Sequence, residues 1–484
     1  MNPFALPWLE LSLAVPLVGA ACVWIIRDAL RSSRWCLAFA GATLGCTLMA
    51  STAFYSAQMP NWSWLDSPKR AVRLGESGYV VQSFATVDEL SAPLLPLVAL
   101  LHLLTALATA RTKMSRFSFS GLLFGCAVRL AVFSCVAPGP LIGLLALDAA
   151  LPYFEIRRRG KPGRLYALHA GLFVVLLVAG WACMQGAVEV GAVLILAAVC
   201  VRTGVAPAHV WVTDLFEKGS FGTALLFATP LAGVYAAVRL VLPAAPEWAL
   251  EALAVVSLGT AVYAAGMGVV EQNARRFFAY LFVSHASLVL VGLGLHSPIA
   301  VTGALVMWLS SALSLTGLGL TLRAVEARVG SLSLTEYRGL YEHAPGLAVC
   351  FLLTGLAVVG FPGTSGFVAA ELLVDEAVGT HEAVGLVVVL AAAINGIGVV
   401  RAYLLLFTGC RHATGAALGV TPRERLTVLT LAALILGGGL FPQTYLESRQ
   451  RAARAVLRDR QSRANPNYEA RNPKQIRITN ESND

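Results

Sequence analysis

GFPGTSGF, residues Gly360–Phe367, interrupts one of the most apolar parts of this chain. The run LAVCFLLTGLAVV (347–359) precedes it and VAAELLV (368–374) follows it, with the carboxylate of Glu371 in the second run. Three glycines and a proline within this stretch oppose a continuous helix, because glycine is conformationally permissive and proline lacks a backbone N–H. The stretch therefore predicts a helix broken in the middle of an apolar segment, with an ionisable residue beside the break.

The rest of the chain has the composition of a membrane protein. Of its 484 residues, 57% are hydrophobic and only 13% are charged, whereas a soluble domain carries about 25% charged residues. Apolar runs long enough to cross about 30 Å of hydrocarbon recur from end to end. We predict an all-α polytopic membrane protein with about fourteen transmembrane helices.

The predicted spans divide the chain into five parts. Three transmembrane helices come first, two sets of five helices follow, and one more helix precedes a polar, basic C-terminal tail. Within that tail, residues 445–463 match a surface amphipathic helix. The boundaries are 1–117 for the first three helices, 118–241 and 249–409 for the two five-helix sets, 425–443 for the last span and 445–484 for the tail.

A second break matches the first in position. RTGVAPAH (Arg202–His209) lies in the fourth helix of the first set, as GFPGTSGF lies in the fourth helix of the second. An odd number of helices per set inverts the second set, and paired broken helices in inverted repeats are typical of ion and solute transporters. The alternative for each break is a proline kink without a function. The helix-break residues are Gly204 and Pro207 in span 7 (189–216), and Gly360, Pro362, Gly363 and Gly366 in span 12 (344–378).

The basic residues are distributed unevenly between the predicted loops. Loops after odd-numbered spans hold most of them, as in 111–116 and 157–164, whereas loops after even-numbered spans hold Lys69, Arg70, Arg73 and little else. Basic loops stay cytoplasmic, so we expect a multi-pass protein of the cell (inner) membrane with its N-terminus outside. This bias explains much of the net charge of +9, and no nucleic-acid partner is expected. The basic tail disagrees with the bias, because fourteen spans place it outside.

Ionisable residues inside apolar helices are rare and usually functional. A lone carboxylate at depth needs a partner or a proton, so Asp148 and Glu371 are the strongest candidates. Arg129 and Arg202 are the candidate partners of Asp148. Isolated histidines are more simply explained by an ordinary core hydrogen bond. The candidate ion path comprises Asp148, Arg202, His209, His285 and Glu371, with Arg129 and Arg401 as candidate charge partners and with His102 and His169 as further buried histidines.

Four segments together resemble the antiporter-like membrane subunits of respiratory complex I, the NADH-quinone oxidoreductase chain 4/5 type. That family is shared with Mrp cation/proton antiporters, membrane-bound hydrogenases and membrane subunits of inorganic-carbon uptake. The resemblance covers about residues 85–410. The segments are VDELSAPLLPL (Val87–Leu97), RTGVAPAHVWVTDLF (Arg202–Phe216), QNARRFFAYLFVSHAS (Gln272–Ser287) and GFPGTSGFVAAEL (Gly360–Leu372).

The resemblance implies proton movement along a central line of charged residues, and this chain matches that line only in part. Asp148 stands near the family's helix 5 glutamate, and Arg202 stands at its helix 7 lysine. An arginine does not lose its proton as a desolvated lysine can, so Arg202 is a poor relay. The other positions of the line read Leu225 or Leu231 in span 8, Ser311 and Leu315 in span 11, and Ala370 in span 12, where Glu371 matches after a one-residue shift.

Three functions compete on these grounds. The first is a proton-translocating membrane subunit of a complex I-like assembly, coupled to chemistry on partner subunits. The second is the proton-conducting membrane partner of a zinc protein resembling carbonic anhydrase, in inorganic-carbon uptake. The third is a degenerate subunit that anchors a partner and conducts nothing.

The sequence indicates no redox chemistry and no active site of its own, so any enzymatic role would be that of a subunit of a NADH-quinone oxidoreductase-like translocase. It shows no nucleotide fingerprint, haem pair, or Cys/His cluster with metal-ligand spacing. We therefore expect no catalytic residues, no metal and no cofactor. The expected partners are the lipid bilayer, protons, other membrane subunits and a soluble energy-coupling subunit.

Overall fold

The computed structural model describes residues 7–56, 85–229, 231–409 and 421–464. Its first helices are α1 (Trp8–Ile25), α2 (Ala29–Ser56) and α3 (Leu94–Leu107), followed by a 3-10 segment over Arg111–Arg116. The next group is α4 (Phe119–Ser134), α5 (Pro138–Arg158), α6 (Arg164–Cys183), α7 (Val188–Thr203), α8 (Val210–Lys218), α9 (Phe221–Ala228) and α10 (Ala232–Ala236), which continues as a π turn over Ala237–Val241. Then come α11 (Glu247–Val270), α12 (Ala274–Gly294), α13 (Pro298–Val329), α14 (Pro345–Val359), α15 (Ser365–Thr380), α16 (Glu382–Phe407), α17 (Pro422–Leu440) and α18 (Gln443–Ala464).

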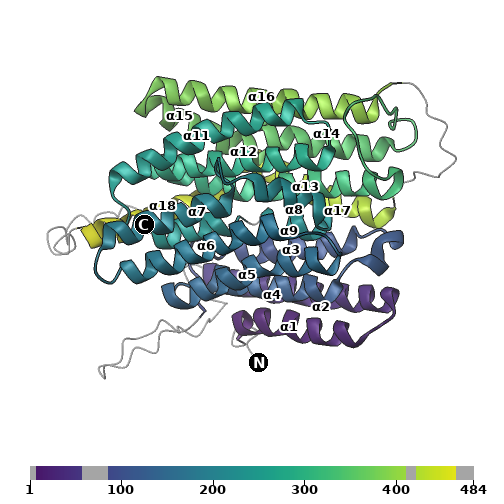
Figure 1. The fold of residues 1–484 in the computed structure, drawn as a ribbon, viewed down its shortest axis with the longest axis horizontal. Coiled ribbons are helices and arrows are strands. Elements are labelled where there is room, and N and C mark those ends of the chain that lie inside the picture. The colour runs from purple at the N-terminus through teal and green to yellow at the C-terminus, as the bar shows by residue number, and fades with distance from the viewer. Residues whose placement is uncertain (1–6, 57–84, 230, 410–420, 465–484) are drawn as a thin grey trace.

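The helices pack side by side with most axes running in a common direction (Figure 1). Within the described ranges, nine helices are long and apolar enough to cross a membrane, or ten if α17 and α18 count as one bent span. The prediction of an all-α polytopic membrane protein is thereby confirmed. The count of fourteen spans and the inverted repeats remain predictions, because α3, α4 and α14 are shorter apolar helices and other spans are divided.

Burial separates an inner group of helices from an outer one. In α12, every residue from Phe277 to Gly294 is buried, which is expected of a helix that is apolar on all sides and enclosed by others. The outer helices instead carry bare apolar side chains: Trp24 of α1 is 80% exposed and Leu386 of α16 is 70% exposed. Such surfaces suit hydrocarbon, so α12 and α13 form the interior and α1, α6 and α16 form the perimeter.

Both predicted helix breaks are present. α7 ends at Thr203 and is capped by Gly204 (φ +80°), and α8 begins at Val210. α14 ends at Val359 and is capped by Gly360 (φ +84°), and α15 begins at Ser365. The positive φ values explain the two glycines, because other residues pay a steric penalty in this conformation. The interruption of each apolar segment was therefore correctly predicted from glycine and proline.

A third break was not predicted. The apolar segment 220–241 is divided between α9 and α10, where Leu231 adopts φ +52°. α10 then continues as a π turn over Ala237–Val241. The available signal in the sequence was Pro230, since proline disfavours the helical conformation of the residue before it.

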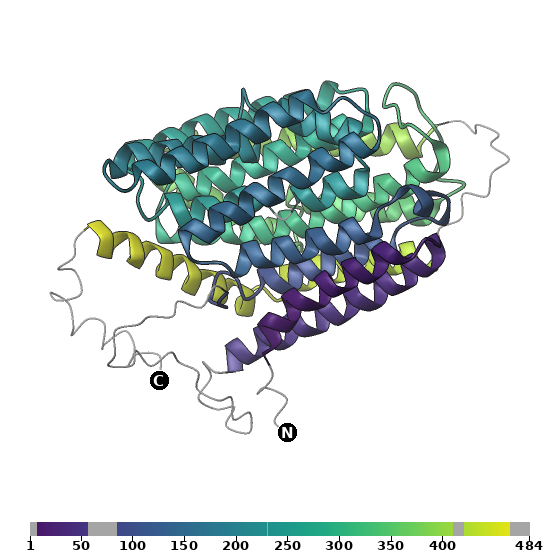
Figure 2. The same ribbon diagram turned by 60° about the horizontal axis from the view of Figure 1, so that its bottom comes forward.

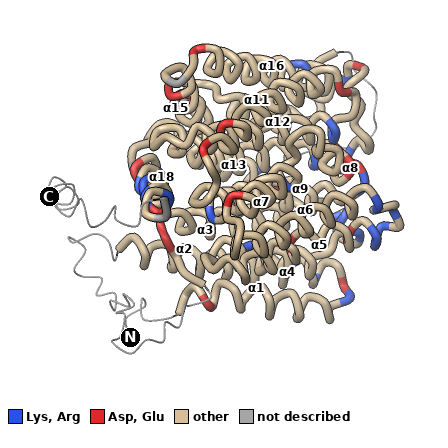
Figure 3. The backbone as a smooth tube through the Cα atoms, turned by 60° about the vertical axis from the view of Figure 1, so that its left-hand side comes forward, with Lys and Arg blue, Asp and Glu red and all other residues tan. Residues whose placement is uncertain are grey.

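The two ends of the bundle differ. At one end, basic residues of the loops around 111–116, 157–164 and 275 gather, on the right-hand side of Figure 3, where most of the blue segments lie; α18 on the left also carries blue. At the other end, α18 turns by 77° from α17 and lies across the bundle (Figure 2). Its buried Arg449 donates to the carbonyls of Glu89 and Leu90, and Arg460 donates to those of Leu242 and Ala245 at 2.9 and 2.8 Å. A helix was predicted for residues 445–463, and α18 occupies that segment. The loop residues Lys69, Arg70 and Arg73 and the tail beyond 464 lie outside the described residues.

Candidate functional site

The buried carboxylate of Asp148 lies at the centre of the candidate site. Its side chain, on α5, is fully buried. Arg202 of α7 donates from Nη2 to Oδ2 at 3.0 Å. Arg129 of α4 approaches Oδ1 with Nε at 3.1 Å, as an ion pair without hydrogen-bond alignment. Three different helices therefore converge on one carboxylate, and both arginines proposed from sequence as its partners are in contact with it.

The first helix break positions Arg202. This residue lies in the last turn of α7, directly before the break at Gly204. After the break, Trp211 of α8 folds back and donates from Nε1 to the Val201 carbonyl at 2.7 Å. The Arg202 guanidinium lies 3.9 Å from the centre of the Phe227 ring of α9, a cation–π contact. The break thus fixes the guanidinium between an aromatic face and the carboxylate.

His102 of α3 extends the cluster. Arg129 Nη1 lies 3.0 Å from His102 Nε2, and His102 Nδ1 lies 2.8 Å from the Val98 carbonyl oxygen. A guanidinium can only donate, so Nε2 accepts and Nδ1 carries the proton that is donated to Val98. This arrangement requires a neutral imidazole. The sequence identified His102 only as a histidine in an apolar helix. Nothing in the sequence indicated that its side chain would contact Arg129 of α4.

The four side chains together form a buried cluster with an excess of positive charge. Two guanidinium groups face one carboxylate, and the histidine between them and the backbone is neutral. Arginine keeps its proton in proteins, so neither Arg129 nor Arg202 is suited to pass one on. The cluster is chemically able to hold Asp148 ionised and to impose a fixed field on a nearby ion. We call these residues, His102, Arg129, Asp148 and Arg202, the Asp148 cluster.

Two other predicted residues lie apart from it. His209 directly precedes α8, with its ring 5.2 Å from that of Tyr263 and its Nε2 3.4 Å from the Tyr263 hydroxyl. His285 is buried in α12, and its Nε2 has no hydrogen-bond partner among the described residues. Within the described ranges, no ion pair or hydrogen bond joins either histidine to the Asp148 cluster.

The predicted residues of the second set also lie apart. Glu371 is exposed on α15. Arg401 of α16 donates to the carbonyls of Glu271 and Leu334 at 3.1 and 3.2 Å. Arg401 therefore links the backbone of two loops to α16. It was a candidate charge partner, but its hydrogen bonds go to carbonyl oxygens and not to a carboxylate.

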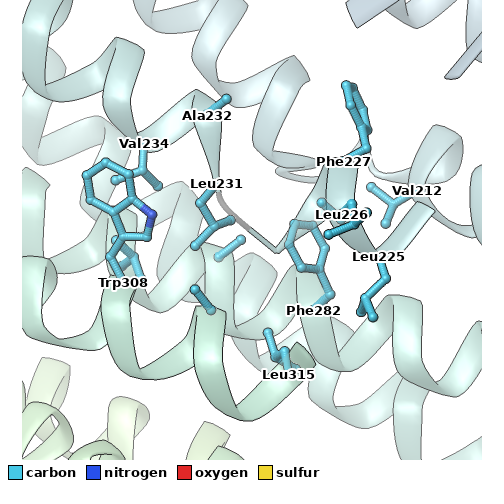
Figure 4. Packing of buried hydrophobic residues seen from close by; sticks show 14 of the residues in the cluster. Val212, Leu225, Leu226, Phe227, Leu231, Ala232, Val234, Phe282, Trp308 and Leu315 are labelled. Atoms are coloured by element: carbon cyan, nitrogen blue, oxygen red, sulfur yellow. The ribbon is translucent and has the colours of Figure 1, made fainter. Parts of the chain in front are cut away.

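The positions at which the family's line of charges is interrupted are packed with apolar side chains. Leu225, Leu231 and Leu315 are each at most 3% exposed. Figure 4 shows them among Phe282, Trp308 and neighbouring aliphatic side chains. These positions contribute no ionisable group between the Asp148 cluster and the second set of helices.

Small hydroxyl groups accompany the leucines along α13. Thr316 Oγ1 lies 3.1 Å from Thr229 Oγ1, beside the break between α9 and α10. Ser310 Oγ lies 3.1 Å from Ser365 Oγ, at the start of α15 beside the second predicted break. Both helix breaks that contact α13 thus present a hydroxyl pair to it. Hydroxyls can both donate and accept, so these pairs are polar contacts that do not require a charge.

Comparison with known proteins shows which family this chain is similar to. Residues 170–395 match the family model described as NADH:quinone oxidoreductase/Mrp antiporter, TM. This segment of the chain is therefore similar to the transmembrane domain of that family. The resemblance inferred from four sequence segments is confirmed, and with it the prediction of an antiporter-like membrane subunit.

Relatives and solved structures agree over nearly the whole length. NAD(P)H-quinone oxidoreductase chain 4 1 of Nostoc sp. is 28% identical over 92% of this chain and 91% of the relative. The chain 4 protein of Gloeobacter violaceus is 28% identical over 95% of each. A chain of respiratory complex I from Thermus thermophilus has a TM-score of 0.78 at 21% identity, covering 93% of this chain and 99% of its own. A chain of the Mrp complex from Dietzia sp. gives 0.77 at 20% identity, covering 93% and 97%. The fold is therefore that of subunits found in multi-subunit membrane complexes.

Proposed function

We propose that this chain is the proton-translocating membrane subunit of a complex I-like assembly, coupling proton movement to chemistry on partner subunits. The observation that carries the proposal is the fully buried Asp148 carboxylate held between Arg129 and Arg202 beside a helix break. The similarity of residues 170–395 to the NADH:quinone oxidoreductase/Mrp antiporter family supports it.

The energetics of the cluster favour a functional role over a purely structural one. Removing ionised groups from water costs several kcal/mol per ion, and apolar packing of similar volume is often as stable as a buried ion pair. Three ionised side chains on helices of an apolar bundle therefore add little to stability. Their charges act on whatever ion approaches them, which is what a translocating subunit requires.

The Asp148 cluster serves the proposed path as a fixed electrostatic element. Asp148 and Arg202 set the local field, while the imidazoles of His209 and His285 supply ring nitrogens that can accept a proton. Hydroxyl pairs along α13 supply polar contacts where the family's charges are replaced by leucine. Glu371, exposed on α15, joins the path where a neighbouring membrane subunit covers that helix.

The basic end of the bundle is the proposed cytoplasmic side. Basic loops are retained in the cytoplasm, and the basic loops of this chain meet at one end while α18 lies at the other. On this proposal the protein lies in the cell (inner) membrane, with its N-terminus and α18 on the outer side. A soluble energy-coupling subunit would then act from the cytoplasmic end through further membrane subunits.

The test is proton flux in vesicles that contain the purified assembly. We expect Asp148→Asn to abolish flux measured with a pH-sensitive dye, while the assembly still elutes intact in size-exclusion chromatography. Glu251→Gln is the matched control, because it removes a carboxylate that is exposed on α11, away from the Asp148 cluster. Flux in Asp148→Asn equal to that of the control would contradict the proposal.

A non-conducting anchor is the second candidate. The dry packing of Leu225, Leu231 and Leu315 favours it, because a proton carrier is missing at each of these positions. The same flux experiment separates the two functions. An anchor gives no flux in the wild-type assembly, and loses partner subunits when its outer helices are altered.

A further inference from the structure

A small cavity at the basic end of the bundle is lined by an unusual number of cations. It has a volume of about 130 Å³ and lies where the 3-10 segment after α3 meets the ends of α5 and α13 and the starts of α9 and α12. Five basic side chains line it, with the single acid Glu326. They are Lys113, Arg116, Arg159, Arg275 and Arg323.

Two of these cations are neutralised by neighbouring acids. Arg275 binds Glu326 through Nε at 2.8 Å and Nη2 at 2.5 Å, and Nη1 donates to the carbonyls of Phe216 and Gly219. Arg159 pairs with Glu155 at 2.9 Å, one helical turn earlier in α5. Arg159 and Arg275 therefore line the cavity, but their positive charges are largely compensated by these two glutamates.

The remaining three cations have no carboxylate partner among the described residues. Lys113 and Arg116 are exposed on the 3-10 segment and enter no ion pair in the described ranges. Arg323 Nη1 and Nη2 donate to the Thr105 carbonyl and the Thr109 hydroxyl, each at 3.1 Å. Both of these acceptors are neutral, so they orient the guanidinium without compensating its charge.

The position of Arg323 is built into the surrounding helices. Its Cζ lies 4.8 Å from the centre of the Phe117 ring, a cation–π contact. On another side, a Cβ added at Gly222 of α9 would come within 3.0 Å of the same Cζ. The absence of a side chain at Gly222 therefore makes room for the guanidinium, which is held in place before any ligand arrives.

We propose that this cavity binds a phosphate group, either of a soluble phosphate or of an anionic lipid headgroup. Three convergent cations match the charge of a phosphate monoester, which carries about −1.5 to −2 at pH 7. The phosphodiester of a lipid headgroup carries a single charge and offers the same kind of acceptor oxygens. Arginine also presents paired N–H groups that suit phosphate oxygens. At about 130 Å³ the cavity exceeds the roughly 30 Å³ occupied by one water, and so it accommodates a phosphate group while any larger remainder stays outside.

The site is independent of the Asp148 cluster. Its cations come from the end of the bundle, whereas Arg129 and Arg202 are committed to Asp148 in the interior. Loss of the proposed ion translocation and loss of phosphate binding are therefore separable outcomes.

The test uses the purified full-length chain in detergent with inorganic phosphate as the probe, measured by isothermal titration calorimetry. We expect Arg323→Gln and the double variant Lys113→Gln/Arg116→Gln each to weaken phosphate binding about tenfold or more, as loss of a charge-assisted hydrogen bond implies. The double variant changes exposed residues only, and so it remains informative if Arg323→Gln folds poorly. Arg425→Gln, which removes an exposed cation from the start of α17, should bind as the wild type does.

A second arm identifies the source of the phosphate. Nanodiscs of phosphatidylcholine are compared with nanodiscs that also contain phosphatidylglycerol, and lipid retained after delipidation is quantified by mass spectrometry. Retention of phosphatidylglycerol that is lost in both cavity variants, but not in Arg425→Gln, supports a headgroup ligand. Equal phosphate and lipid binding by all variants overturns the proposal. The proposal is also overturned if the cavity variants bind phosphate and lipid normally but fail to assemble with partner subunits. That result would assign the cavity to a carboxylate of a partner protein.

Discussion

At the scale of single residues, the charges of the Asp148 cluster predict an unequal response to its two simplest substitutions. Asp148→Asn leaves two buried guanidinium groups without a carboxylate, whereas Arg202→Gln leaves the neutral Arg129–Asp148 pair intact. An uncompensated buried charge costs about 3–5 kcal/mol. We expect Asp148→Asn to lower the thermal unfolding midpoint of the detergent-solubilised chain clearly more than Arg202→Gln does.

The comparison includes its own control. In the double variant Asp148→Asn/Arg202→Gln, a single guanidinium remains, so the midpoint should lie above that of Asp148→Asn alone. A lower midpoint for Arg202→Gln than for Asp148→Asn would show that the two arginines do not share one carboxylate.

The residue scale also shows how far sequence reasoning reaches. The proximity of Asp148 to Arg129 and Arg202 followed from the cost of a lone carboxylate at depth. The exposure of Glu371 did not follow, because successive helix residues are rotated by about 100° around the axis. Ala370, one position earlier, packs partly buried against the core, while Glu371 faces outward. A one-residue register choice therefore reverses the face on which a charge is placed.

At the scale of elements, the broken helix α14/α15 depends on glycine at close approach as well as at positive φ. A Cβ at Gly366 would lie 2.4 Å from the Ala357 carbonyl oxygen, which belongs to helix backbone and cannot move aside. Gly366→Ala must therefore displace α15 from α14. Overpacking of this kind typically costs about 1–3 kcal/mol, so we expect a lower thermal midpoint in detergent.

Gly437→Ala in α17 is the matched substitution, because nothing lies within 4 Å of a Cβ there. Its midpoint should equal or slightly exceed the wild-type value, since alanine favours a helix over glycine. If both variants were equally stable, the close contact between α14 and α15 would not exist in the protein.

The helices also show which helix breaks can be predicted from the sequence. Gly204 and Gly360 end their helices with positive φ, and clusters of glycine and proline made both predictable. At Leu231 the same conformation is adopted by a leucine, which has no intrinsic preference for it. Packing around Leu231 in the core, with the residue 3% exposed, holds this conformation. That packing is tertiary information: Pro230 signals an interruption in the local sequence, but nothing local predicts the conformation of Leu231.

At the scale of the whole molecule, two chemically distinct ends predict the sidedness of the protein. The cavity with Lys113 and the loops around it occupies one end, and α18, with Arg458 exposed, lies across the other. If basic loops are cytoplasmic, a cysteine at 113 and a cysteine at 458 must react with reagents added on opposite sides of the membrane.

This is tested with Lys113→Cys and Arg458→Cys, each in a chain whose native cysteines are replaced by alanine. A membrane-impermeant maleimide added to intact cells should label only Arg458→Cys, and labelling of Lys113→Cys should require inverted vesicles. Labelling of both positions from one side would contradict the fold, because α18 and the cavity would then share an end. If Lys113→Cys were labelled from outside and Arg458→Cys only in inverted vesicles, the fold would stand but the orientation would be inverted. The basic residues of α18, and not those of the loops, would then determine the cytoplasmic side.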